Sequence, residues 1–150
     1  MEWRQGVGKA AEQKHQLVLP GIIHEATGPD DTSYLIGGKC EACGRVFFPK
    51  CFVCRICMNE GTMREVPLST IGAIDTFTVV HVAPLGFKAP YVQAYVDLPE
   101  GPRVFSLITG CDPLGSDLKE GAEVELVVGK IREDENGRDL IGYMFRPTGR

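Results

Sequence analysis

The sequence lacks the features that mark a membrane-spanning or exported chain. No apolar run approaches the roughly 18 residues that cross a bilayer. The first fifteen residues are polar and contain no apolar stretch of the kind found in a secretory signal. We therefore expect a cytoplasmic globular protein.

Recognisable catalytic motifs are also missing. The chain has no Gly-rich phosphate loop ending in Lys-Ser or Lys-Thr, no Gly-x-Ser-x-Gly elbow and no His-Glu-x-x-His pair. No group of titratable residues is clearly arranged for catalysis. The sequence thus favours a binding or scaffolding module that is not catalytic alone.

An excess of positive charge is absent as well. Residues 1–60 contain seven Lys/Arg and seven Asp/Glu, whereas residues 61–150 contain nine and thirteen, and the net charge of the chain is −4. A protein that neutralises many phosphates needs a basic surface. This distribution argues against nucleic acid as a ligand, although a small anion held by a few cations stays compatible with it.

Cysteine, by contrast, is abundant and clustered. Six cysteines in a chain without an export signal indicate a reducing compartment, where thiols bind metals more often than they pair. Cys40-x-x-Cys43 and Cys54-x-x-Cys57 are two ligand pairs separated by ten residues, and Gly44 suits the tight turn after the first pair. The spacing predicts a zinc ribbon whose closed set of four thiolates makes the Zn²⁺ structural, with iron as the alternative metal.

Cys51 complicates the choice of ligands, because Cys51-x-x-Cys54 is also a Cys-x-x-Cys pair. The choice of Cys54 and Cys57 leaves a return arm of ten residues, whereas Cys51 and Cys54 leave only seven. Ribbon geometry therefore favours Cys54 and Cys57, with the other pairing left open.

The rest of the chain has the pattern of strands. Turn-forming residues separate five segments that favour β structure, and Asn136-Gly137 suits a two-residue hairpin turn. We predict a mainly β protein in which a ribbon precedes a five-stranded OB-type barrel. The expected units are an arm and loop over 1–34, containing a short strand near 17–19, a ribbon over 35–65 and a barrel domain over 66–150. The expected barrel strands cover residues 71–82, 91–98, 103–110, 122–131 and 139–145.

Several other residues could carry chemistry, but structural roles are favoured for them. Cys111 could act as a nucleophile with His24 or His81, yet a free Cys usually packs as a small apolar residue. Nothing in the sequence places a carboxylate next to either histidine. Five aromatic residues could stack on the bases of a single strand, but without a basic stripe we expect them to pack in the core. These aromatic residues are Phe77, Phe87, Tyr91, Tyr95 and Phe105.

The segment GGKCEACGRVFFPKCFVCRIC (37–57) and the strands that follow it, TIGAIDTFTVVHV, APYVQAYVDLPEGPRVFSLITG, GAEVELVVGKI and YMFRP, resemble the zinc-ribbon/OB-fold family of acyl-CoA-associated proteins over about residues 38–147. That family typically reads Cys-x-x-Cys-Gly, an apolar stretch, Pro-Pro-Arg and Cys-Pro-x-Cys. Here Lys50 and Cys51 replace a Pro and the Arg, and Arg55 replaces the later Pro.

The resemblance implies a rubredoxin-like ribbon followed by an OB barrel. It also implies a non-catalytic subunit of a thiolase-type enzyme, with two copies each of this chain and of a thiolase-fold partner that contains the catalytic residues. The candidate contacts to the anionic head of a CoA ester are Lys39, Arg45, Lys50 and Arg55. Residues 46–48 and 86–91 are the expected exposed apolar surface for the partner. A single-stranded nucleic-acid-binding OB module is the alternative.

Overall fold

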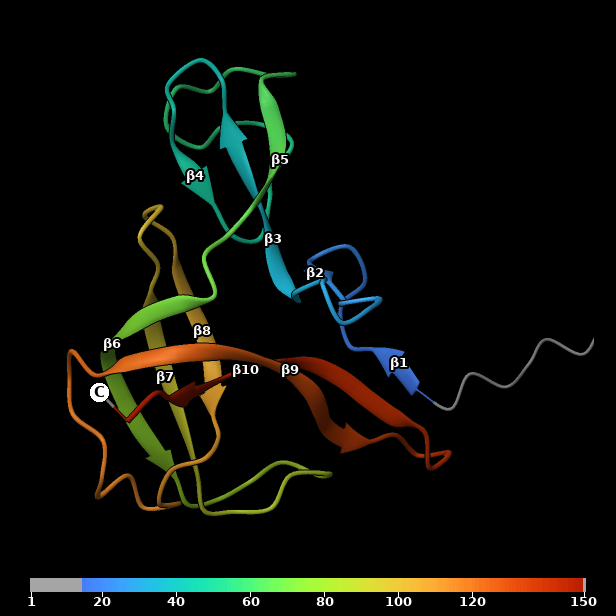
Figure 1. The fold of residues 1–150 in the computed structure, drawn as a ribbon, viewed down its shortest axis with the longest axis vertical. Helices are drawn as coiled ribbons and strands as arrows, with labels where there is room; N and C mark the ends of the chain where they lie inside the picture. Colours follow the sequence, from blue (N-terminus) through green and yellow to red (C-terminus); the bar gives the residue numbers. More distant parts are fainter. Residues whose placement is uncertain (1–14, 150) are drawn as a thin grey trace, which may run out of the picture.

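The computed structural model describes residues 15–149, which form strands and loops without any helix. Within this range there is consequently no helix long and apolar enough to cross a membrane. Residues 1–14 of the expected arm and loop over 1–34 lie outside the described residues. Two sheets make up the fold, one in the ribbon and one in the barrel (Figure 1).

The ribbon sheet is built around one central strand. β3 (Tyr34–Cys40) pairs antiparallel with β2 (Ile23–His24), β4 (Val46–Phe47) and β5 (Met63–Pro67). β3 ends at its only cysteine, so the strand delivers the first candidate ligand directly to the tip of the ribbon.

The barrel is a closed ring of five strands, as predicted. β9 pairs with β6, β6 with β7, β7 with β8, β8 with β10, and β10 with β9 (Figure 1). β1 (His15–Leu17) adds a parallel strand to β10, two residues before the short strand expected there. The strands of the ring are β6 (Ile71–Val80), β7 (Tyr91–Asp97), β8 (Arg103–Ile108), β9 (Glu123–Glu133) and β10 (Asp139–Pro147).

Strict alternation along the strands fills the barrel. On β7, Val92, Ala94 and Val96 are buried, and the residues between them face outward. Gly72 on β6 lies so close to this strand that a Cβ there would stand 2.7 Å from Cγ1 of Val96. The barrel core is therefore aliphatic and closely packed, with Phe145 at the largest fully buried position.

The same alternation corrects the prediction that the aromatic residues belong to the core. Tyr95 and Phe105 lie on the outer side of β7 and β8, where both are exposed and their ring centroids are 5.4 Å apart. Phe77 alone among the five packs against the buried cluster. Composition identified these strands correctly, but the side of each strand depends on its pairing register.

The hairpin prediction at Asn136-Gly137 was also wrong in length. β9 ends at Glu133 and β10 begins at Asp139, so residues 134–138 form the connection. The Asp134 carboxylate accepts hydrogen bonds from the backbone N–H groups of Asn136 and Arg138, both at 2.8 Å. An aspartate that holds the loop this way favours the longer turn, in which Gly137 alone has a positive φ, 76°.

Aromatic packing joins the ribbon to the barrel. Phe48 makes an edge-to-face contact with Tyr143 of β10 at 5.6 Å, and Val46 packs on the buried cluster. The prediction that residues 46–48 form an exposed docking surface was therefore wrong, because these side chains are half-buried within the chain itself.

Candidate metal centre

Two loops at the tip of the ribbon, which we call the first and second knuckle, carry the cysteine pairs. The first knuckle, residues 40–45, follows β3 directly. Its turn closes when the N–H of Gly44 donates to the Cys40 carbonyl at 2.7 Å, with Gly44 at φ 77°. Gly tolerates this left-handed conformation without steric cost, as the sequence pattern indicated.

The second knuckle, residues 52–59, repeats this geometry. Here the N–H of Met58 donates to the Cys54 carbonyl at 3.0 Å, and Met58 has a φ of 59°. The Cys54 N–H donates to the Asn59 carbonyl at 3.1 Å, and a bridge between Val53 and Glu60 closes the loop. Met58 thus occupies the place that Gly44 has in the first knuckle.

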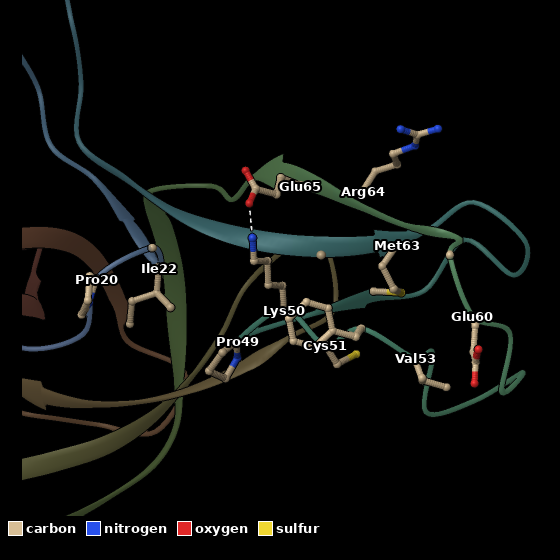
Figure 2. Close-up of a pocket in the computed structure, with 14 residues that line it drawn as sticks. Pro20, Ile22, Pro49, Lys50, Cys51, Val53, Glu60, Met63, Arg64 and Glu65 are labelled. Carbon is tan, nitrogen blue, oxygen red and sulfur yellow. Dashed lines mark hydrogen bonds and ion pairs between the residues drawn. The ribbon is translucent and has the colours of Figure 1, made fainter.

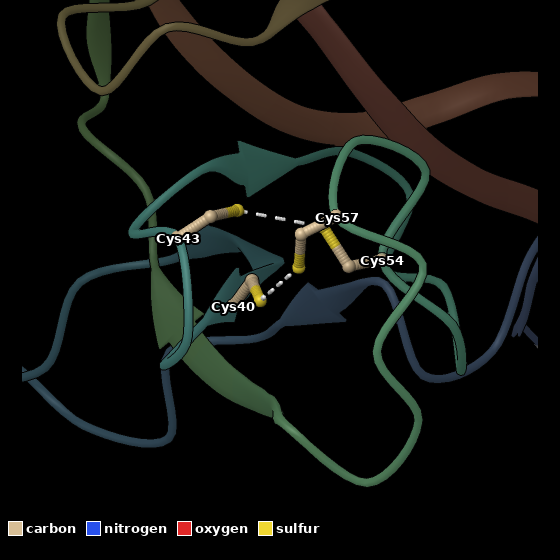
Figure 3. A group of neighbouring side chains, drawn as sticks. All are labelled: Cys40, Cys43, Cys54 and Cys57. Carbon is tan, nitrogen blue, oxygen red and sulfur yellow. Dashed lines mark hydrogen bonds between the residues drawn. The ribbon is translucent and has the colours of Figure 1, made fainter.

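The two knuckles bring four sulfur atoms to one point (Figure 3). The Sγ atoms of Cys40, Cys43, Cys54 and Cys57 all lie within 4.8 Å of one another. Two of the Sγ–Sγ distances are 3.6 Å, between Cys40 and Cys57, and 3.5 Å, between Cys43 and Cys54. A tetrahedral zinc with bonds of about 2.3 Å requires sulfur–sulfur edges of about 3.8 Å. The donor set and its spacing therefore fit a tetrahedral thiophilic metal ion such as Zn²⁺.

Hydrogen bonds to the sulfur atoms favour the thiolate form of two of the four cysteines, Cys40 and Cys54. The Thr62 hydroxyl, 3.2 Å from Cys40 Sγ, is the main reason that the pKa of Cys40 falls to about 6, with backbone N–H groups contributing. The N–H of Cys57 likewise lowers the pKa of Cys54. The N–H of residue 45 favours the Cys43 thiolate, but burial and hydrogen bonds to the neighbouring thiols outweigh it and raise the Cys43 pKa to about 11. Metal binding must therefore displace a proton at Cys43.

Cys51 does not join the cluster. It lines a neighbouring cavity of about 690 Å³ between the ribbon strands and the second knuckle (Figure 2). Lys50, which pairs with Glu65, lies in the same wall together with Met63. The structure thus places the sulfur atoms of Cys54 and Cys57, and not that of Cys51, opposite the first pair.

The four cations predicted to contact CoA are all exposed. Lys50 lines the cavity beside Cys51, and its charge is already paired with Glu65. Among residues 15–149, Lys39, Arg45 and Arg55 have no carboxylate within ion-pair distance. These three remain available to an external anion.

One histidine has a carboxylate partner that the sequence did not indicate. His24 Nε2 lies 2.9 Å from Asp31 Oδ2, and its ring stacks on Tyr34 at 4.5 Å. A separation of seven residues through a loop leaves no sequence signal for this pair. His81 is exposed, whereas Cys111 is half-buried against the core.

Cys111 has the surroundings of a structural thiol. Burial is the main cause that raises its pKa, and the carboxylates of Asp117 and Asp112 raise it further. A nucleophilic cysteine needs the opposite environment, in which cations or N–H groups favour the thiolate.

An apolar groove of about 380 Å³ lies on the outside of the barrel, and Phe87 and Tyr91, from the segment 86–91 expected to be exposed and apolar, line part of it. Val18 and Leu19, which follow β1, line it together with Ile22, Ile23 and residues of the barrel such as Phe105. Because the groove is assembled from distant segments, no local sequence pattern predicts its full set of lining residues.

Comparisons with known proteins agree with this architecture of a cysteine ribbon joined to an OB barrel. Residues 65–129 match the family model described as ChsH2, C-terminal OB-fold domain. A DUF35 domain-containing scaffold protein of Pyrococcus furiosus is 47% identical over 116 residues, which cover 75% of this chain and 82% of that protein. The chain therefore belongs to the DUF35 (ChsH2-type) OB-fold family.

Two further relatives extend the match. Benzoylsuccinyl-CoA thiolase subunit BbsA of Thauera aromatica is 37% identical over 144 residues, which cover 95% of this chain and 96% of that subunit. Among solved structures, the Ltp2–ChsH2(DUF35) aldolase contains a similar chain, with a TM-score of 0.60, 28% identity, and coverage of 76% of this chain and 84% of that one.

Proposed function

We propose that this chain is the non-catalytic, zinc-containing subunit of a thiolase-type enzyme that acts on CoA esters. The observation that carries the proposal is the nearly end-to-end similarity to subunits named for benzoylsuccinyl-CoA thiolase. The surroundings of Cys111 agree with it, because the one cysteine apart from the ribbon is held as a thiol. The small subunit of a benzoylsuccinyl-CoA thiolase of anaerobic toluene breakdown is the specific form of this proposal.

In this proposal Cys40, Cys43, Cys54 and Cys57 hold Zn²⁺. A zinc ion bound by four thiolates has no position left for water or substrate, so it would supply a structural cross-link. The ribbon unit then comprises residues 35–65 and the barrel unit residues 66–150, preceded by the arm and loop over 1–34.

The proposed contacts to the CoA ester are the cations of the ribbon. Lys39, Arg45 and Arg55 have no intramolecular ion pair; of these, Lys39 and Arg45 are proposed to bind the phosphates of the CoA head, whereas Lys50 must first release Glu65. Changing Lys39 and Arg45 to Ala is expected to raise the KM for the CoA ester of the assembled enzyme. An unchanged KM would remove this part of the proposal.

The nucleic-acid alternative has one observation in its favour, the exposed Tyr95–Phe105 pair on the barrel. The neighbouring Arg103, however, is paired with Asp97 at 2.7 Å and Asp75 at 3.0 Å, so its charge is already neutralised. Salt-sensitive binding of an oligonucleotide by the purified chain would support this alternative over the first.

Affinity capture tests the main proposal directly. The tagged chain, expressed in its source organism, is expected to co-purify with a thiolase-fold protein at near one-to-one, in a complex with two copies of each. Thiolysis of a CoA ester should then require both proteins. Absence of a stoichiometric thiolase-fold partner would refute the proposal.

A further inference from the structure

The second knuckle carries large apolar side chains that the chain itself does not cover. Phe52 is 91% exposed, Met58 70% and Ile56 60%, all within seven residues of one loop. Isolated exposed apolar residues are common, but such a concentration in one short loop is typical of a protein–protein interface. The Val53–Glu60 bridge and the hydrogen bond from the Met58 N–H to the Cys54 carbonyl close the loop.

The backbone of Met58 adopts a conformation that is unfavourable for any residue with a Cβ atom. Met58 is the only residue other than Gly with a positive φ among residues 15–149, and the equivalent position of the first knuckle is Gly44. A glycine would adopt this conformation without the clash between Cβ and the backbone. A bulky residue in a strained backbone state, with its side chain in solvent, indicates a use for that side chain outside the folded chain.

Arg55 lies in the middle of the same loop and also lacks a partner. No Asp or Glu occurs between residues 42 and 59, and Arg55 has no ion pair in the described part of the chain. The guanidinium is therefore free to meet a carboxylate from another molecule. Phe, Met and Arg together are the residue types enriched at the centres of interfaces.

We propose that the second knuckle inserts Phe52, Ile56 and Met58 into an apolar pocket of the thiolase-fold partner, where a partner carboxylate accepts hydrogen bonds from Arg55. This inference rests on the proposed function, because it names the surface through which that partner is held. Because the second knuckle presents apolar side chains around one unpaired cation, we expect the pocket of the partner to be apolar with an acidic rim.

The test measures the affinity between the zinc-loaded full chain and the separately purified thiolase-fold protein that co-purifies with it. The triple variant Phe52→Ser/Ile56→Ser/Met58→Ser is expected to raise Kd at least 30-fold. A matched control, Val82→Ser/Leu85→Ser, removes two exposed apolar side chains from a loop of the barrel and should change Kd less than twofold. Zinc content of both variants is measured alongside.

A second variant separates binding from folding. Met58→Gly relieves the backbone strain, so the ribbon should melt at the same or a higher temperature, yet Kd should rise at least threefold. Arg55→Ala should weaken binding and reduce its dependence on salt. If the triple variant loses zinc, Met58→Gly decides the question alone.

The outcomes are distinguishable. Wild-type affinity in the triple variant, or in Met58→Gly, would overturn this inference and leave the proposed function intact. Failure of the wild-type chain to bind any thiolase-fold protein would overturn both.

Discussion

Removal of the metal is expected to unfold the ribbon and to leave the barrel folded. Between residues 41 and 62, Cys54 is the only buried side chain, and the half-buried Val46 and Phe48 pack on the barrel, so the two knuckles have almost no apolar core of their own. Complete burial of such a side chain contributes about 1–2 kcal/mol. Zinc binding contributes about 10–16 kcal/mol in small structural sites, several times as much as that burial. The metal therefore decides whether this segment is ordered.

The barrel has a different source of stability. Its buried cluster includes Val92, Val96, Val104 and Phe145, none of which is a candidate ligand. We expect this core to persist without metal, because burial of aliphatic side chains does not depend on the ion.

Hydrogen exchange with and without a strong chelator at pH 7 checks this reasoning. Peptides covering residues 41–62 should lose protection by several orders of magnitude, and peptides from β7 and β8 should keep theirs. Added zinc should restore the ribbon and provides the control for reversibility. Retained protection of residues 41–62 in metal-free protein would refute the reasoning, as would simultaneous loss of protection in both parts.

Three further predictions concern single residues. Cys57→Ser is expected to abolish stoichiometric zinc binding measured by mass spectrometry, whereas Cys51→Ser should keep one zinc per chain; the reverse result would exchange their roles. Gly72→Ala should lower the free energy of unfolding by about 2–3 kcal/mol through overpacking against β7, and Gly28→Ala, with no atom within 4 Å of the added Cβ, should change it little. A hydrogen bond from Arg103 lowers the pKa of Asp97 below 3.8. The stabilisation that the ionised Asp97 gives to the folded protein is therefore present above about pH 4 and is lost as the pH falls through that lowered pKa. The difference in melting temperature between wild type and Asp97→Asn should accordingly shrink on acidification, and a difference that stays constant down to pH 2 would contradict this assignment.

Local spacing was sufficient for much of the fold and the candidate site. Two Cys-x-x-Cys turns each present two thiols to one point, so the sequence predicts the cluster that the structure assembles from Cys40, Cys43, Cys54 and Cys57. Apolar alternation between turn residues likewise indicated five strands, which the structure closes into a ring. The Cys-x-x-Cys spacing and the apolar alternation each span two or three residues, so local backbone geometry is enough to interpret them.

Tertiary structure decided what depends on register and on contacts between distant segments. A shift of one residue reverses the two faces of a strand, so only the observed pairing shows that Tyr95 and Phe105 face outward. The His24–Asp31 pair and the burial of Phe48 against Tyr143 require loops and sheets to meet in space. The exposure of the second knuckle is likewise visible only once the folded chain leaves it uncovered, because burial is a property of the whole molecule and not of the spacing between residues.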